Sequence, residues 1–137
     1  MNRLHPNQLN HSALDYAVAV AQNLPILQDP MGFASMSPNP VQAGYWIWFG
    51  NSQNGTSNLI GSGYSPSTDW RIGGGIIDAH NISIIEPSDD NPLWTSSDPS
   101  IVGETALIAA MRFYVLMTLG ESVEVPDMAI NDQGVAA

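Results

Sequence analysis

The stretch from Glu104 to Gly120, ETALIAAMRFYVLMTLG, is apolar over most of its length and contains no proline. This composition predicts a long helix that ends at Gly120, because glycine readily adopts the left-handed conformation that closes a helix. A helix that is apolar on nearly every side is buried rather than laid on a surface. The rest of the chain must therefore fold around this segment. It is slightly too short for a membrane span, and Arg112 interrupts it.

The length and composition of the chain indicate one small domain. We expect its 137 residues, 1–137, to form a single core over residues 12–126, with a frayed tail over 127–137. Only 12% of the residues are charged, about half the usual share. A surface with so few charges often takes part in subunit contacts, so we expect a homo-oligomer.

The charges are strongly one-sided. Thirteen Asp and Glu residues face three arginines, Arg3, Arg71 and Arg112, and the formal net charge is -10. Such a field repels nucleic acid and anionic membrane surfaces, so neither is expected as a partner. The chain has no cysteine, and its three histidines lack the spacing of metal ligands, so no metal site and no cofactor are expected. The N-terminus has no signal-peptide pattern, which favours the cytoplasm.

The first half of the chain predicts one helix and one hairpin. SALDYAVAVAQNL, residues 12–24, has an apolar face, and Ser12 with Asp15 forms a capping-box pattern at its start. Residues 26–43 are rich in proline, glycine and serine, which is typical of a long loop. Residues 45–49 and 56–60 are rich in β-forming residues and flank a turn at Asn54-Gly55, so they predict a hairpin.

The second half predicts short strands on either side of the apolar helix. NISIIEP, residues 81–87, reads as a strand that ends at a proline, and residues 121–126 alternate as a last strand. Residues 88–100 form a polar loop that contains Trp94. This order of elements predicts an α+β fold: a small single-domain sandwich of a short, mainly antiparallel sheet packed with two main helices.

The segment YSPSTDWRIGGGII, residues 64–77, is the most distinctive of the chain. Ser67, Thr68 and Asp69 can each cap a helix, so we expect a helix to start near Ser67, with a glycine-rich turn after it. Helix N-termini and glycine-rich turns expose backbone amides that bind anions. A purely structural alternative is that Asp69 caps a helix, Trp70 packs in the core and the glycines allow close packing.

Four blocks of the sequence resemble the NinX-like family of small phage and prophage proteins. They are ALDYAVAVA, YSPSTDWRIGGGII, TALIAAMRFYV and GESVEVP, in the family's order, and together they span about residues 12–126. The family's middle block usually has proline where this chain has Gly75, which predicts a more flexible turn here. Its helix commonly has cysteine where this chain has Phe113. The resemblance implies a phage accessory protein in the host cytoplasm and implies no established activity.

Candidate ligand contacts are two of the arginines, Arg71 and Arg112, and several aromatic residues. Arg71 could bind a phosphate, and Arg112 needs either an anionic ligand or an acidic partner such as Asp69, Asp15 or Glu104, because an unpaired buried charge is costly. Aromatic rings near loops could stack on a base. The predicted ligand-binding set is Tyr45, Trp48, Tyr64, Ser65, Ser67, Thr68, Asp69, Trp70, Arg71, Gly73, Gly74, Gly75, Trp94 and Arg112.

These features favour binding over catalysis. Ser67, His80 and Asp78 could be combined into a triad only without support from their spacing, so no enzyme is expected. We expect the protein to sequester a small nucleotide-type host immune signal, such as a cyclic ADP-ribose derivative or a cyclic dinucleotide. The alternative is an acidic module that docks on and inhibits a host protein; it predicts that the acidic residues after Ile85 gather on one exposed face. A hydrolase of such signals is a third possibility.

Overall fold

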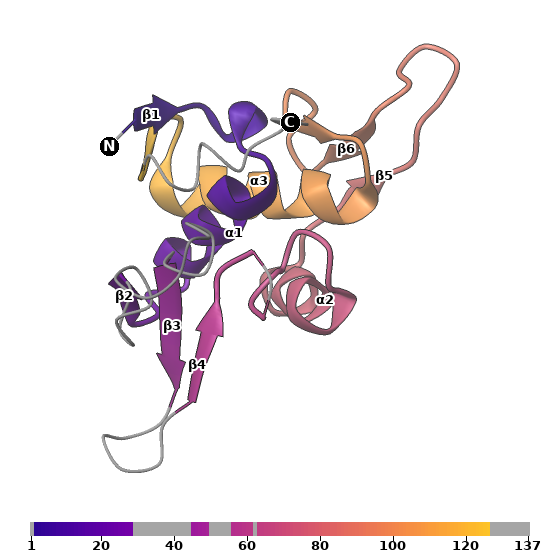
Figure 1. Cartoon of the computed structure of the whole chain (residues 1–137). Helices are drawn as coiled ribbons and strands as arrows, with labels where there is room; N and C mark the ends of the chain where they lie inside the picture. The colour runs from indigo at the N-terminus through magenta and orange to yellow at the C-terminus, as the bar shows by residue number, and fades with distance from the viewer. Residues whose placement is uncertain (1, 29–44, 50–55, 62, 127–137) are drawn as a thin grey trace, which may run out of the picture.

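The computed structural model describes residues 2–28, 45–49, 56–61 and 63–126. These residues form a mixed α+β fold in which three helices make the body and short strands surround it (Figure 1), so the predicted fold class is confirmed. The three α-helices are α1 (His11–Ala21), α2 (Trp70–His80) and α3 (Ala106–Leu119), and a short 3-10 helix, η1 (Pro6–Gln8), precedes them. The strands are β1 (Asn2–Leu4), β2 (Ile26–Gln28), β3 (Tyr45–Phe49), β4 (Thr56–Leu59), β5 (Ile84–Ile85), β6 (Trp94–Ser96), β7 (Val102–Gly103) and β8 (Val123–Val125).

The apolar helix α3 is the centre of the fold, as its sequence predicts. The side chain of its N-cap, Thr105, accepts a hydrogen bond from the amide of Ile108 at 3.1 Å. Gly120 closes its C-terminus with a φ of 91°, a backbone conformation that glycine adopts without strain. α3 packs against α1, α2 and the strands β6 and β7. Among the described helices, none combines the length and the apolar character that crossing a membrane requires.

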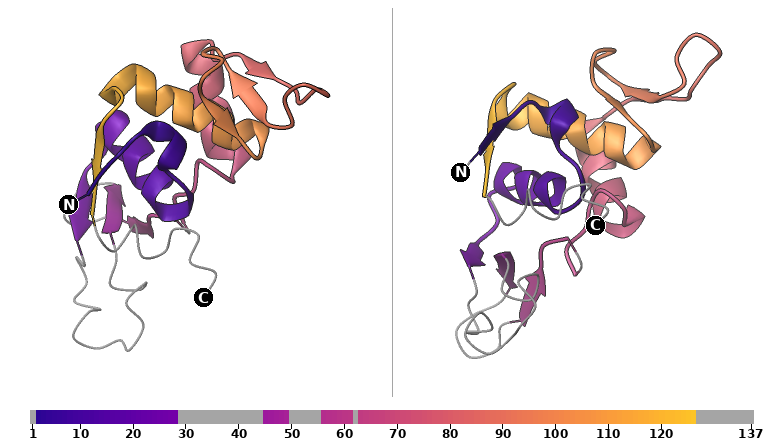
Figure 2. Two further views of the ribbon diagram at one scale, coloured as in Figure 1. Left: turned by 90° about the horizontal axis from the view of Figure 1, so that it is seen from above. Right: turned by 45° about the horizontal axis from the view of Figure 1, so that its top comes forward.

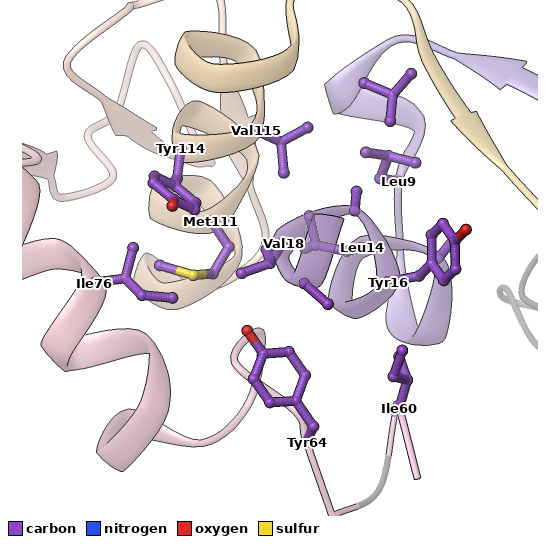
Figure 3. Close-up of a cluster of buried hydrophobic side chains, with 14 of the residues drawn as sticks. Leu9, Leu14, Tyr16, Val18, Ile60, Tyr64, Ile76, Met111, Tyr114 and Val115 are labelled. Carbon is purple, nitrogen blue, oxygen red and sulfur yellow. The ribbon is translucent and has the colours of Figure 1, made fainter. Parts of the chain in front are cut away.

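The core lies between the three helices. Figure 3 shows side chains from α1, α2 and α3 meeting there, together with Tyr64 from the segment before α2. The fully buried members include Leu14 and Val18 of α1 and Met111 and Val115 of α3. Burial of such side chains contributes about 1.5–3 kcal/mol each relative to leaving them in water.

The strands form three small antiparallel sheets rather than one. β1 pairs with β8, β3 lies between β2 and β4, and β6 lies between β5 and β7. Two views of the ribbon show these sheets at different sides of the helical body (Figure 2). The predicted hairpin over residues 45–49 and 56–60 is confirmed as β3 and β4. The predicted strand after Gly120 is confirmed as β8.

Parts of the two predicted loops are strands. The loop expected over residues 26–43 begins with β2, because Ile26–Gln28 completes the edge of the β3–β4 hairpin. Within the loop expected over 88–100, Trp94 starts β6, which pairs with both β5 and β7. The strand β1, which pairs with β8, is not among the predicted elements. Residues 29–44, the Asn54-Gly55 turn and the tail 127–137 lie outside the described residues.

The predicted capping box at the start of α1 is wrong. The N-cap is Asn10, and the helix begins at His11, so Ser12 already lies inside the first turn. Asp15 is 2% exposed and faces the interior rather than the helix start. An aspartate on an otherwise apolar helix face therefore has a partner elsewhere in the fold.

Candidate functional site

The segment YSPSTDWRIGGGII folds into a turn followed by a helix. The amides of Thr68 and Asp69 donate to the carbonyl of Ser65, which closes the turn. Asp69 is the N-cap of α2, and its carboxylate accepts from the amide of Arg71 at 2.9 Å. The helix therefore starts at Trp70, three residues after the predicted start at Ser67. The structural interpretation of Asp69 as a cap is confirmed.

The inner side of this segment is fixed to α1. The amide of Ser67 donates to the carboxylate of Asp15 at 2.9 Å, and both residues are buried. The hydroxyl of Tyr64 donates to the side-chain carbonyl of Gln22. Tyr64 points toward α1 and α3 (Figure 3). These bonds, together with the burial of Tyr64 and Pro66, hold the start of α2 rigidly on the helical body.

The outer side of the same segment is open to solvent. The Trp70 side chain is 56% exposed, which makes it the most exposed of the large hydrophobic side chains that the structure describes. The prediction that Trp70 packs in the core is therefore wrong. Arg71 is also exposed, and its guanidinium lies 3.0 Å from the carboxylate of Asp69. The hydrogen bonds from Arg71 hold the pKa of Asp69 below its ordinary value.

The three glycines lie inside α2, so the predicted glycine-rich turn is wrong. The amide of Gly73 donates to the carbonyl of Asp69 at 2.9 Å, as a helical amide does. A Cβ at Gly73 would lie 2.4 Å from the carbonyl oxygen of Pro66 and 2.5 Å from Leu107 of α3. Gly74 has the ring of Trp70 as its nearest such neighbour, and Gly75 faces open space. Gly73 thus permits close packing, and its amide is not available to an anion.

Arg112 is a structural residue of the interior. It is 7% exposed, and it donates to the carbonyls of Leu9 at 3.0 Å and Val102 at 2.7 Å and to the side-chain oxygen of Asn10. These acceptors are neutral, so the predicted ion pair with an acidic side chain is replaced by bonds to carbonyl oxygens. Burial lowers the pKa of Arg112, and the charge of Glu104 partly opposes this effect.

Two other predicted aromatic contacts, Tyr45 and Trp94, lie on two sheets rather than on the segment that carries Arg71. Tyr45 lies on β3 and packs edge-to-face on Tyr16, with ring centroids 5.4 Å apart. Trp48 is also on β3, and its side chain lies outside what the structure describes. Trp94 is half-buried on β6, in a different sheet. The members of the predicted set within residues 64–75 lie in one segment, of which Thr68, Trp70, Arg71 and Gly75 are exposed.

The structure does not assemble a triad from Ser67, His80 and Asp78. Ser67 precedes α2 and is buried, whereas His80 ends this helix and is exposed. A helix rises 1.5 Å per residue, so the two ends of α2 lie about 15 Å apart, with Ser67 before one end and His80 at the other. Within the described ranges, no group of three or more His, Cys, Asp or Glu side chains is placed to hold a metal ion.

Three buried tyrosines make the stability of the fold sensitive to alkaline pH. Burial raises the pKa of Tyr16, Tyr64 and Tyr114 above the ordinary value of 10.0, and the Asp15 charge raises that of Tyr64 further. Above pH 10 the unfolded chain loses these protons before the folded protein does, so the free energy of unfolding falls as pH rises. Each such tyrosine contributes a slope of up to about 1.4 kcal/mol per pH unit.

Replacing Tyr64 by phenylalanine should make this decline less steep, because one of the three groups is removed. Denaturant unfolding of both proteins between pH 8 and pH 11 measures the two slopes. An unchanged slope in Tyr64→Phe would show that Tyr64 ionises equally in the folded and unfolded states.

The comparison with known families identifies the chain. A family model described as "Bacteriophage P22, NinX" matches residues 6–118, which is most of the sequence. The chain belongs to the NinX family. No curated protein matches this NinX-like phage protein.

The blocks that mark this NinX protein are also the ones that join its helices. ALDYAVAVA lies in α1 and places Asp15 against Ser67 of the middle block. TALIAAMRFYV lies in α3 and places Leu107 against Gly73. Where the middle block usually has proline, this NinX protein has Gly75 inside a continuous α2. The expected flexible turn at that position is therefore a helix.

Proposed function

We propose that this NinX protein acts by docking on a host protein through the surface at the start of α2, formed by Thr68, Trp70 and Arg71. The observation that carries the proposal is the 56% exposure of Trp70 beside an exposed arginine. Tryptophan and arginine are enriched among the residues that dominate binding energy at protein interfaces. An exposed indole also offers a large apolar contact area, with a polar N–H, that a protein partner can bury.

The support beneath this surface favours binding. Asp69 caps α2, and the Asp15 carboxylate holds the amide of Ser67, so Trp70 stands on a fixed backbone. A contact residue on a rigid support loses little conformational entropy when it binds, which strengthens association. The remaining freedom is mostly that of the exposed side chains.

The arginines favour a protein partner over an anionic ligand. Arg71 is paired with Asp69, and Arg112 is buried against carbonyl oxygens. A phosphate at Arg71 would have to compete with the Asp69 carboxylate in a chain whose net charge is -10. A protein partner with basic residues would instead be attracted by the negative net charge of the chain.

Sequestration of a nucleotide-type signal is the second candidate. It is favoured by the adjacency of Trp70 and Arg71, since an indole can stack on a base while a guanidinium contacts a phosphate. A cyclic ADP-ribose derivative or a cyclic dinucleotide offers both groups. A second copy of the chain would then have to cover the ligand, as the predicted homo-oligomer allows.

Replacing Trp70 by alanine should abolish partner binding without unfolding the protein, because the indole is mostly in solvent. The tagged protein is used to capture proteins from a host lysate, and captured proteins are quantified by mass spectrometry. Met117→Ala is the matched control, because Met117 is also exposed, at 46%, but lies on α3. We expect one protein to be retained by the wild type and by Met117→Ala and lost with Trp70→Ala.

Equal capture by all three proteins would remove Trp70 from the binding surface. The second candidate is tested by incubating each protein with a panel of nucleotide signals and analysing what heat denaturation releases. Intact nucleotide released from the wild type but not from Trp70→Ala would favour sequestration instead of docking. A chemically changed nucleotide would favour a hydrolase.

A further inference from the structure

A second exposed surface lies on the segment between β5 and β6, residues 86–93, called here the β5–β6 arm. The arm extends away from the helices (Figure 1), and both further views show the same extension (Figure 2). Its end is closed by two backbone hydrogen bonds between Ser88 and Asn91, of 2.8 and 3.2 Å. The Asn91 side chain also accepts from the amide of Leu93. The arm is therefore ordered by its own bonds.

Two large apolar side chains are exposed where the arm leaves the sheet. Ile85 is 52% exposed and Leu93 is 37% exposed. Ile85 is the last residue of β5, and Leu93 directly precedes the first residue of β6. The two strands pair next to each other, so both exposed side chains lie at the base of the arm. Ile85 and Leu93 are together called here the arm face.

The charges around the arm face select the kind of molecule that can cover it. Glu86 directly follows Ile85, and Asp89 and Asp90 lie in the turn at the end of the arm. All three are exposed, and residues 86–93 contain no cation. An apolar surface near carboxylates is complementary to a partner surface on which an apolar area is bordered by Lys and Arg side chains. The favoured occupant therefore carries basic side chains.

A second copy of the chain does not meet this requirement. The chain has no lysine, and all three of its arginines are engaged. Arg3 pairs with Glu124 at 3.0 Å, Arg71 pairs with Asp69, and Arg112 is buried. Two copies meeting through their arms would bring six carboxylates together without a free arginine to offset them.

We propose that the arm face binds a protein other than a second copy of this chain. The contact on that protein is an apolar surface bordered by Lys and Arg side chains. The inference rests on the proposed docking function and adds the chemistry of the partner at a second surface. It involves residues 85–93, none of which belongs to the Trp70 surface, so each surface is tested by its own variants.

Photo-crosslinking tests which molecule covers the arm face. A benzophenone amino acid is placed at position 93 in the full chain, produced in host cells and irradiated, with the same amino acid at position 117 as control. We expect a stronger adduct from position 93, with a host protein whose crosslinked peptide contains Lys or Arg. An adduct with a second copy, a peptide without basic residues, or no adduct above the position-117 level overturns the proposal.

The affinity for the crosslinked protein gives a second measurement. The double variant Asp89→Asn/Asp90→Asn and the double variant Ile85→Ser/Leu93→Ser should each weaken binding at least about tenfold. The charge variant should also reduce the salt dependence of the affinity. Asp78→Asn/Glu121→Gln is the matched control, because it removes two exposed carboxylates outside the arm. Equal affinities for all of these proteins overturn the proposal.

The Trp70 variant separates failure of the arm face from failure of the proposed function. If Trp70→Ala loses the partner while the arm variants keep it, docking through α2 stands and the arm inference is wrong. If neither the Trp70 surface nor the arm face binds a host protein, the docking function and the arm inference are both wrong.

Discussion

Replacing Arg112 by methionine is expected to destabilise the protein by about 3 kcal/mol, the upper range for losing a hydrogen-bonded charge in the interior. The guanidinium donates to Leu9 and Val102 backbone carbonyls and to the Asn10 side chain. It therefore ties the segment before α1 and the strand β7 to α3. Methionine fills much of the space but donates nothing, so the buried carbonyls lose their partner.

Denaturant unfolding at pH 7 measures the effect, with Arg71→Met as the control. Arg71 is exposed and bonded to its neighbour Asp69, so the same substitution there should change stability far less. If Arg112→Met and Arg71→Met have equal stability, the bonds of Arg112 do not hold the fold together. Arg112→Lys should not restore full stability, because a single ammonium group lacks the guanidinium's spread of donors.

Replacing Gly73 by alanine is expected to destabilise the protein by about 2 kcal/mol, a typical cost of forcing a methyl group into a packed site. The new Cβ would stand 2.4 Å from the Pro66 carbonyl oxygen and 2.5 Å from Leu107. Of these two, the Pro66 oxygen is backbone, so relief requires α2 to move from the turn or from α3.

Gly75→Ala is the matched control, because it makes the same change two residues later in α2. A Cβ at Gly75 meets nothing within 4 Å. Alanine is a better helix former than glycine by about 0.8–1 kcal/mol, so this variant should be stabilised. Thermal and denaturant unfolding of both variants give the two signs. A stable Gly73→Ala protein would contradict the close approach of α2 to Pro66.

The elements that the sequence predicted well are those whose local pattern matches their environment. The helix α3 is apolar, carries a capping Thr105 and ends at Gly120, so pattern, cap and stop agree. The β3–β4 hairpin likewise follows from its β-rich residues. β1 and β2 are three residues long and are defined by pairing with segments far along the chain, which local pattern cannot reveal.

The sequence places the helix start within three residues of Trp70, but it does not predict how the rest of the segment folds. Asp69 was a clear cap in the sequence, and it is the N-cap of α2. The glycine run suggested a turn, because glycine disfavours helices, yet packing against Pro66 and Leu107 outweighs that preference. The sequence predicts an acidic partner or an anionic ligand for Arg112, whereas its acceptors are carbonyls and an asparagine that only the fold brings near.

The docking alternative predicts that the acidic residues after Ile85 gather on one exposed face. Those that the structure describes do not all lie on one face. Glu86, Asp89 and Asp90 are on or beside the β5–β6 arm, whereas Glu124 is on β8, at the opposite side of the helices (Figure 1). The arm therefore carries three exposed carboxylates, and other exposed carboxylates, such as that of Glu124, lie elsewhere on the described residues.

Native mass spectrometry of the protein purified from host cells tests the central claim most directly, because it weighs what is bound. Docking through Trp70 predicts a complex whose mass is that of the chain plus one host protein. We expect this complex for the wild type and for Met117→Ala, and we expect it to be absent for Trp70→Ala. A bound species with the mass of a nucleotide, with no protein partner, would contradict docking and support sequestration.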